Sequence, residues 1–396
     1  MLVAVVSLRA TGNDGAGRGK TVLRVAPERA GAADGSSWSD AAPLSALPDL
    51  VSELPAGGEV WLRADEGPYD VEESLKLRAG GADGDPVVVR GVDEDGDPEP
   101  AVLRAGRASP YSPDGEPGGD VFSLRGGADH LVFRDLAFQD VGNAFIAAGD
   151  VRDITVTAVE ATNVRRFFEN DVADDEQSAD LRGLVVRDVS VKGFSKRFLR
   201  LRYASSDVLV EDVEADSERQ DGDDFAIGVH LEDEVSDVVL RRVRMDNTRD
   251  TLREYWNGDG FATEREVSGV QLIDTTANGH TDAGYDLKSR RTTLTGATAT
   301  GNKRNFRFWA DDTTAEDCTG TDPVKRGGNG TQAQVWMGEG AAVEMVDCTL
   351  TDSSPDTVVF DLENDASLTL TGGGEVQHEG ELRRLSNGAT LELPES

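Results

Sequence analysis

The stretch VVLRRVRM (238–245) alternates apolar and polar residues, and five other stretches of the chain repeat its pattern. These are LVFRDLAF (131–138), LVVRDVSV (184–191), VLVEDVEA (208–215), VQLIDTTA (270–277) and VEMVDCTL (343–350). Strict alternation is typical of half-buried strands, and no sustained helical period follows residue 60. The chain is therefore predicted to be a series of similar β units.

Between these stretches, aromatic residues recur at intervals of 21 to 36 residues. They are Phe122, Phe145, Phe168, Phe198, Phe225, Phe261, Tyr285, Phe306, Trp336 and Phe360. Coils of uneven length suit a solenoid, in which each turn contacts only its neighbours and accepts insertions. Each unit repeats its predecessor in the same direction without hairpin turn chemistry, which argues for parallel stacking. These patterns predict an all-β, single-stranded right-handed parallel β-helix of about ten coils.

A stack of coils exposes sheet edges at its two ends, and natural proteins cover such edges. Apolar residues at helical spacing between residues 44 and 54 predict a capping helix there, with Pro48 tolerated in its first turn. The first strand is expected at EVWLRA (59–64). The Gly-rich, polar segment 1–20 is predicted to be disordered, which leaves 21–396 as a single β-helix domain.

The charge balance narrows the choice of partners. The chain has 75 acidic and 40 basic residues, a net charge of −35. The electrostatic field of this negative charge repels nucleic acid and anionic lipid. No apolar run is long enough for membrane insertion. An acidic, lysine-poor surface is similar to that of proteins from extreme halophiles, where molar salt shortens the screening length to ~3 Å. An ordinary acidic protein is the alternative, and a monomer is expected.

Cys318 and Cys348 are the only cysteines and occur in similar contexts, EDCTGTD and VDCTLTD. We expect them at equivalent places on successive coils, about 4.8 Å apart and within reach of a disulfide. Two buried thiols in a ladder are an equal alternative.

Most common catalytic signatures are missing from the sequence. The four histidines show no zinc-ligand spacing, and no G-x-S-x-G nucleophile elbow occurs. DGAGRGKT (14–21) has Asp14 in place of the first glycine of a phosphate loop and precedes a strand-like segment. We therefore dismiss a phosphate-loop function.

Three consecutive coils carry the informative residues. Alignment on the aromatic column places GFATE (260–264) over GYDLK (284–288) over NFRFW (305–309). Because side chains of a strand alternate, the aromatic residues should face inward and their neighbours outward. Two columns are predicted to face solvent: Ala262, Asp286 and Arg307 in one, and Glu264, Lys288 and Trp309 in the other.

Several aspartates converge on this predicted surface. Asp259 and Asp282 lie just upstream of the column that contains Asp286, and Asp223 and Asp224 occur one coil earlier. Carboxylates about 5 Å apart can share one Ca²⁺ ion, whose oxygen ligands lie 2.3–2.6 Å away. The alternative is a chance cluster, since 75 residues are acidic and aspartate is common at β-helix turns. A calcium site is one prediction for this surface.

The segments WNGDGFATER (256–265) and TDAGYDLKS (281–289) resemble the core of the family 9 polysaccharide lyases. Members of that family are right-handed β-helices that act on polygalacturonate, with aspartates that bind Ca²⁺ and a lysine as Brønsted base. The resemblance implies a pectate-lyase-like solenoid with calcium ligands at Asp259, Asp282 and Asp286, and with Arg307 at the position of the base.

Two residues depart from the family pattern. Ala283 stands where the family has one of two paired aspartates, and Arg307 stands where it has lysine. Outside these motifs the likeness is to β-helix proteins in general, some of them uncharacterised repeat proteins. A shared fold does not by itself establish an activity.

The resemblance implies a calcium-dependent polysaccharide lyase that cleaves an acidic, uronate-containing polysaccharide by β-elimination. Ca²⁺ would bind the uronate carboxylate and acidify the C5 proton, which a base then removes. Arg307 is an awkward base because the pKa of free arginine exceeds ~12. Lys288 is the local alternative as base, although a simple ion pair with Glu264 on the preceding coil is the favoured explanation for it.

An insertion at 246–258, in the longest coil, offers further candidates for substrate binding. Arginine suits carboxylate recognition, and aromatic faces suit sugar rings. The candidates are Arg249, Arg253, Tyr255 and Trp256, together with Trp309 on the outer wall. The alternative is that Tyr255 and Trp256 merely pin the insertion to the coils.

Two other functions stay open. GDDFAI (222–227) is similar to the paired-aspartate segment of the polygalacturonases, which would make the protein an inverting hydrolase. A non-catalytic β-helix that binds glycan or serves at the cell surface is the third interpretation. The opening of the chain resembles that of many secreted β-helix carbohydrate enzymes, which implies an extracellular or cell-surface location.

Overall fold

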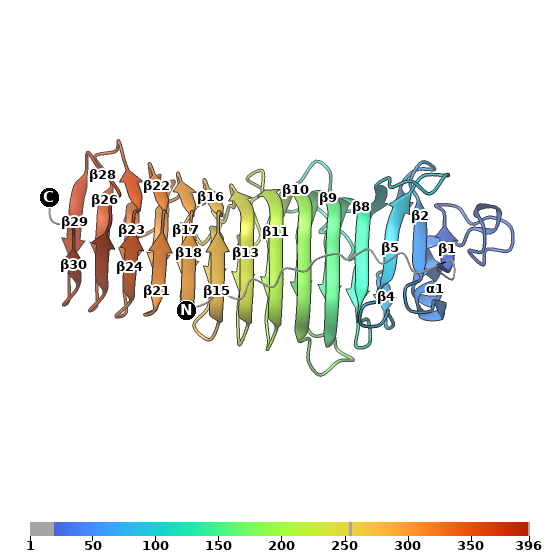
Figure 1. Cartoon of the computed structure of the whole chain (residues 1–396). Coiled ribbons are helices and arrows are strands. Elements are labelled where there is room, and N and C mark those ends of the chain that lie inside the picture. Colours follow the sequence, from blue (N-terminus) through green and yellow to red (C-terminus); the bar gives the residue numbers. More distant parts are fainter. Residues whose placement is uncertain (1–19, 253–255, 395–396) are drawn as a thin grey trace.

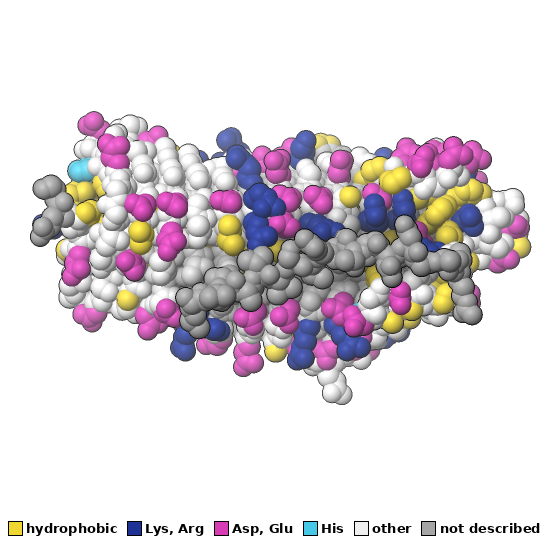
Figure 2. All heavy atoms as spheres, in the orientation of Figure 1, with side chains coloured by type: hydrophobic (Ala, Val, Ile, Leu, Met, Phe, Trp, Pro, Cys, Tyr) yellow, Lys and Arg dark blue, Asp and Glu magenta, His cyan; other side chains and the backbone are white. Residues whose placement is uncertain are grey.

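The computed structural model describes residues 20–252 and 256–394 and forms a long rod of stacked strands (Figure 1). The named strands pair in parallel, each with its equivalent one coil earlier and one coil later. The predicted right-handed parallel β-helix is therefore confirmed. Acidic side chains are spread along the length of the face that Figure 2 shows, in keeping with the net charge of −35.

Each coil contributes strands to three faces. The first face holds β1 Val22–Val25, β2 Glu59–Arg63, β5 Val87–Val92, β15 Ser268–Ile273, β18 Arg290–Thr295, β21 Thr313–Glu316, β24 Ala342–Val346, β27 Ser367–Thr371 and β30 Thr390–Glu392. The second face holds β3 Tyr69–Asp70, β6 Ala101–Arg104, β16 Thr276–Asn278, β19 Thr298–Thr300, β22 Thr319–Thr321, β25 Thr349–Thr351 and β28 Val376–Gln377.

The third face carries the candidate site. It holds β4 Leu75–Leu77, β7 Phe122–Leu124, β12 Ile227–Leu231, β14 Asp259–Thr263, β17 Ala283–Leu287, β20 Arg304–Phe308, β23 Ala333–Met337, β26 Val358–Leu362 and β29 Glu381–Leu385. In the middle of the rod the strands run on through corners. Here β8 Leu131–Ala147, β9 Val151–Asn170 and β10 Leu181–Leu201 cross all three faces, and β11 Ser206–Asp216 and β13 Ser236–Asp246 cross the first two.

The core is a column of apolar side chains that runs through the rod. Phe261, Tyr285 and Phe306 stack on successive coils, with ring centroids 5.1 and 5.4 Å apart and nearly parallel planes. Further along, Phe122 and Phe145 stack in the same way at 5.4 Å. The prediction that the aromatic residues face inward is confirmed for these positions.

Two members of the predicted aromatic column do not lie in it. Trp336 pairs with Arg307 in the outward column. Phe225 precedes β12, and the residue that pairs with Phe261 in the ladder is Val229. The Phe225 side chain is exposed at the rim of the third face instead. The period alone could not place it, because the coil here contains extra residues that shift the register.

The corner between the first and second faces has a left-handed backbone in the coils from β8 to β27. The residues at this corner are Asp135, Ala158, Asp188, Asp212, Arg242, Asp274, Gly296, Asp317, Asp347 and Gly372, with φ between 51° and 83°. Aspartate and glycine adopt positive φ more readily than other residues. The aspartate that recurs in the alternating stretches is thus explained by backbone geometry.

The ends and the cysteines follow the sequence pattern. A 3₁₀ turn at Leu44–Ala46 and helix α1 (Leu47–Glu53) lie at the amino-terminal end of the stack, which confirms the capping helix (Figure 1). Cys318 and Cys348 are joined by a disulfide across adjacent coils.

The predicted disorder of segment 1–20 concerns residues that, except for Lys20, lie outside the described ranges. No described helix has the length and apolarity that crossing a membrane requires.

Candidate functional site

A groove of about 510 Å³ runs over the third face at β10, β12, β14, β17 and β20. We call it the third-face groove. It is lined by Arg197, Arg200, Phe225, Ile227, His230, Glu232, Asn257, Asp259, Ala262, Glu264, Asp286, Lys288, Arg307 and Trp309. Charged side chains dominate this lining, whereas the opposite side of the same strands packs into the apolar core.

The floor of the groove is one column of the parallel ladder. Strand pairing places His230 beside Ala262, Ala262 beside Asp286, and Asp286 beside Arg307. The predicted column of Ala262, Asp286 and Arg307 is confirmed. Since Ala262 offers only a methyl group between larger neighbours, the floor is hollow at this coil. His230 and Asp286 flank the hollow, two coils apart, or about 10 Å.

Asp282 is the most heavily paired carboxylate of the site. It is fully buried and lies 2.5 Å from Lys303 Nζ and 2.9 Å from Arg304 Nη1. Its other oxygen accepts a hydrogen bond from Arg307 Nη1 at 3.3 Å. Three cations around one carboxylate leave this group no affinity for a further positive charge.

Asp286 and Arg307 join the groove floor to an aromatic wall. Asp286 Oδ1 accepts a hydrogen bond from Trp309 Nε1 at 2.7 Å and lies 3.5 Å from Arg307 Nε. The Arg307 guanidinium lies 4.4 Å from the Trp309 ring and 5.0 Å from the Trp336 ring. Such cation–π contacts and ion pairs fix the position of the guanidinium. The predicted outward column is therefore largely shielded from solvent, with Arg307 only 9% exposed.

Asp259 differs from its neighbours because it lacks a cation of its own. It is buried beside β17 and accepts a hydrogen bond from the Ala283 backbone N–H at 2.6 Å. Burial, followed by the nearby charges of Asp286 and Asp282, raises the pKa of Asp259 well above its ordinary value. Asp259 is therefore the carboxyl of the groove that most readily holds a proton.

The second predicted column also forms. Lys288 Nζ lies 2.8 Å from Glu264 Oε1 and 3.5 Å from Asp286 Oδ2. Despite the opposing effect of burial, these carboxylates raise the pKa of Lys288. Glu264 Oε1 also lies 3.7 Å from His230 Nε2, and the pKa of Glu264 falls to about 2. The ion pair anticipated for Lys288 is present, and it opposes a role as base.

His230 is a titratable group that the sequence did not single out. Its side chain is 5% exposed, and burial lowers its pKa below the ordinary value of 6.5. Glu232 and Glu264 lie 3.8 and 3.7 Å from its two ring nitrogens, beyond hydrogen-bond distance. His230 is therefore a neutral imidazole at neutral pH, and it faces the groove.

The residues around Asp282 do not fit a calcium ion. Four cations lie within 3.5 Å of Asp282 or Asp286, namely Lys288, Lys303, Arg304 and Arg307. A divalent cation would be repelled by them and would need six to eight oxygen ligands. Among the described residues, no three histidine, cysteine or acidic side chains are grouped so that they could hold a metal ion. Calcium thus stays a prediction without support from this geometry.

Other predicted residues lie away from the groove. Asp223 pairs with Arg165 at 2.8 Å and accepts a hydrogen bond from Ser195 at 2.6 Å, in a separate cavity. Asp224 is half-buried beside it and does not line the groove. These two aspartates therefore do not join Asp259, because they belong to the loop that precedes β12.

The insertion contributes less to the groove than expected. Trp256 packs against Gly327 and Gly328, which supports the alternative that it pins the insertion to a neighbouring loop. Arg249 is half-buried and does not line the groove. Arg253 and Tyr255 lie outside the described residues. Trp309 lines the groove as predicted, and its platform role stays a prediction.

Sequence reasoning missed the early part of the groove. These are Arg197 and Arg200 from β10, His230 from β12 and Glu232 just after β12, one to two coils before the motif region. The available clue was the interruption of the apolar pattern by a run of basic residues, KRFLRLR (196–202). Trp336, one coil beyond Arg307, was taken for a core aromatic.

The fold is shared with carbohydrate enzymes of known structure. The chain is similar to pectate lyase Pel9A, with a TM-score of 0.55 and 14% identity over 85% of this chain and 78% of that one. It is also similar to the A-module of the mannuronan C-5 epimerase AlgE4 from Azotobacter vinelandii, with a TM-score of 0.52 and 14% identity over 88% and 94%. No protein-family model and no curated protein sequence matches the chain. At this identity the likeness shows a pectate-lyase-like β-helix fold.

Proposed function

We propose that the protein is a carbohydrate-active enzyme that cleaves a uronate-containing polysaccharide by β-elimination, outside the cell or at its surface. The observation that carries the proposal is the hollow over Ala262, with the neutral His230 on one side and the Asp286–Arg307 pair on the other. A sugar ring that enters this hollow would meet a group that accepts protons and a group that binds carboxylates.

Arg307 and Lys288 are proposed to act on the uronate as cations. Both are held charged by Asp286, and Arg307 is also paired with Asp282. Positive charge beside the uronate carboxylate stabilises the carbanion that forms when C5 loses its proton. This role differs from that of the base expected for them, because their ion pairs oppose deprotonation.

His230 is the group best suited to take the C5 proton. The proton passes to the imidazole, the C5–H electron pair forms the C4–C5 double bond, and the C4–O bond breaks. The leaving oxygen needs a proton, and Asp259 is the carboxyl whose raised pKa lets it supply one. Trp309 offers an aromatic face to the sugar. No step in this scheme passes through a metal ion.

The test is a substrate screen in molar salt with polygalacturonate, alginate and other uronans, each with added Ca²⁺ or with a chelator. We expect growth of the ultraviolet absorbance of an unsaturated product, and equal rates with chelator. A rate that disappears with chelator would restore the calcium prediction. New reducing ends without that absorbance would indicate a hydrolase, and glycan retention without cleavage a binding module; each of these outcomes contradicts the elimination.

A further inference from the structure

Positive charge gathers at one end of the third-face groove, although the protein as a whole carries −35. The cations are Arg165, Arg166, Lys196, Arg197 and Arg200, from neighbouring coils β9 and β10. Of these, Arg197 and Arg200 line the groove itself, and Arg165 lines a separate cavity. Three carboxylates pair with some of them: Asp223 with Arg165, Glu169 with Arg166 and Arg200, and Glu232 with Arg200. Five positive charges against three negative ones leave an excess of two.

Arg197 is the unpaired member of this group. Its side chain is 95% buried and lines the groove, yet no described residue gives its guanidinium a hydrogen bond or an ion pair. Its Nε atom is buried without a hydrogen-bond partner. Burial lowers the pKa of Arg197 to about 10. The carboxylates of Glu232 and Glu169 act on it only from beyond ion-pair distance. A buried charge without a close counterion is costly to a protein, and an anion from solution would reduce that cost.

Lys196 lies beside Arg197 and has no described partner for its ammonium either. Burial, with the nearby Arg166 and Arg197 charges, lowers its pKa to about 8. The backbone explains why two adjacent cations occur here, because the register between β9 and β10 shifts between Phe194 and Arg197. Such a β-bulge inserts a residue and re-aims the side chains next to it, a frequent arrangement beside binding sites.

The position of these cations fits a linear polymer. Arg200 lies two coils before Ala262 in the same ladder column, and Arg197 lies two coils before Asp259 in the adjoining one. Two coils span about 10 Å along the rod. A glycan chain that places one sugar over Ala262 would therefore bring a neighbouring sugar within reach of Arg197. Ile227, between Arg197 and Asp259, offers no competing charge.

We propose that Arg197 and Lys196 form an anion-binding subsite that takes the carboxylate of a second acidic sugar. This assignment of ligand rests on the proposed function. It restricts the substrate to polymers that carry acidic sugars in close succession, as opposed to glycans in which a uronate stands alone among neutral sugars. A sulfate ester offers the same anionic chemistry, and the test separates the two.

The first experiment uses inorganic sulfate as the probe and the whole protein. Thermal unfolding is followed in sulfate and in chloride at equal ionic strength, for the natural protein, Arg197→Met and Lys196→Met. We expect sulfate to raise the melting temperature of the natural protein more than chloride does, and Arg197→Met to abolish the difference. Arg197→Met should itself melt no lower than the natural protein, because it removes an unpaired buried charge. Equal sulfate effects in Arg197→Met and the natural protein would overturn the subsite.

The second experiment measures oligosaccharide binding by calorimetry. We expect Arg197→Met to bind uronate oligosaccharides at least tenfold more weakly, with unchanged affinity for the same oligosaccharides after reduction of their carboxyl groups. Arg242→Met, on another face, should behave like the natural protein. A tenfold loss seen with sulfated neutral oligosaccharides, and not with uronates, would replace the carboxylate by a sulfate ester and overturn the assignment.

The two proposals fail in different ways. If the protein neither cleaves nor binds any glycan but Arg197→Met loses the sulfate effect, an anion-binding site stands, and both the proposed function and the sugar assigned to the site are wrong. If the natural protein cleaves a uronan and Arg197→Met does so with unchanged KM, the function stands and the subsite is wrong.

Discussion

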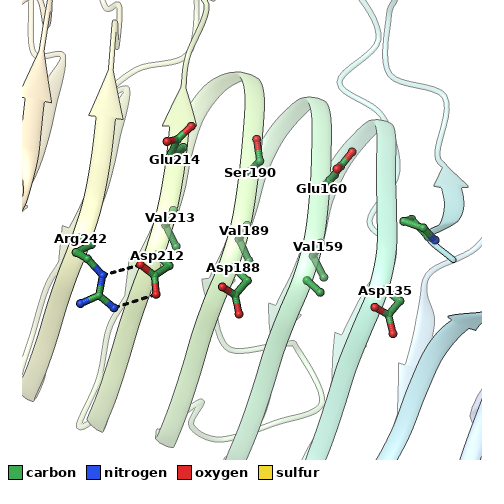
Figure 3. Close-up of a pocket in the computed structure, with 12 residues that line it drawn as sticks. Asp135, Val159, Glu160, Asp188, Val189, Ser190, Asp212, Val213, Glu214 and Arg242 are labelled. Carbon is green, nitrogen blue, oxygen red and sulfur yellow. Dashed lines mark hydrogen bonds and ion pairs between the residues drawn. The ribbon is translucent and has the colours of Figure 1, made fainter. Parts of the chain in front are cut away.

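Two hollowed surfaces of the rod contain several carboxylates, and the reason for the carboxylates differs between them. The third-face groove encloses about 510 Å³, and the surface at the corner of the first and second faces encloses about 560 Å³. At the corner, Asp135, Asp188 and Asp212 occupy equivalent places on β8, β10 and β11, all with φ of 53° (Figure 3). Arg242 takes the next equivalent place and pairs with Asp212. These aspartates occur here because the backbone adopts a positive φ at this corner in successive coils.

The groove column does not repeat. Its residues change at each coil from Arg200 to His230, Ala262, Asp286 and Arg307, and none of these changes is required by the backbone. In a solenoid, a position that departs from the repeat needs a reason other than the fold. The comparison teaches that acidic residues by themselves mark no site here, and that the buried, non-repeating and charge-paired column is the better candidate.

Replacement of His230 should have the largest effect on activity. Once a uronan that the protein cleaves has been identified, His230→Gln is expected to lower kcat by about 10²–10⁴-fold. This is the usual contribution of a general base. Because the neutral imidazole is the active form, the rate of the natural protein should rise with pH, with a midpoint below 6.5. His130→Asn is the matched control, since His130 is also buried but lies at a corner with φ of 53°. Equal losses in both variants would contradict the role of His230.

Loss of Asp282 should have the largest effect on stability. Asp282→Asn leaves Lys303, Arg304 and Arg307 buried without their shared carboxylate, and breaking a buried ion pair costs about 3–5 kcal/mol. Asp188→Asn at the exposed corner should change the free energy of unfolding by less than about 0.5 kcal/mol. Urea unfolding in constant salt measures both. A small effect at Asp282 would mean that its cations are compensated in another way.

A buried histidine outside the groove should make the protein sensitive to acid. His280 is fully buried against Thr248 and the Met245 carbonyl, and burial lowers its pKa to about 3. Below pH 6.5 the unfolded chain takes up this proton and the folded chain does not, so stability falls as pH drops. The loss should be on the order of 3 kcal/mol between pH 7 and pH 4.

The variant His280→Gln isolates this contribution. We expect its free energy of unfolding to fall less steeply with acid than that of the natural protein, whereas the exposed His378→Gln should change nothing. Parallel pH profiles for His280→Gln and the natural protein would show that His280 takes up its proton equally in both states.

The smallest effect is expected at the corner pair. The guanidinium of Arg242 and the carboxylate of Asp212 lie at the surface, where salt screens their attraction. Arg242→Gln should lower the melting temperature slightly in dilute buffer and not measurably in molar salt. The natural protein should gain stability from salt as its acidic surface is screened. If Arg242→Gln lowered the melting temperature equally in dilute buffer and in molar salt, the corner pair would stabilise the fold more than a screened surface ion pair can.

The sequence by itself determined the solenoid fold and which residues occupy equivalent positions on adjacent coils. Alternating stretches and recurring aromatic residues were sufficient to predict the fold, because each coil packs in the same way as the one before. The same local logic predicted the capping helix and the alignment of Ala262, Asp286 and Arg307, since these residues lie on adjacent coils at constant spacing.

Only the tertiary structure decided which charges meet. Lys303 and Arg304 turn toward Asp282, and His230 and Arg197 line the groove from one and two coils before the motif. Insertions such as the one before β12 shift the register by amounts that a period cannot give, as the exposed Phe225 shows. Ion pairs and pKa values depend on distances between coils and on burial, and both of these quantities are defined only in the folded chain.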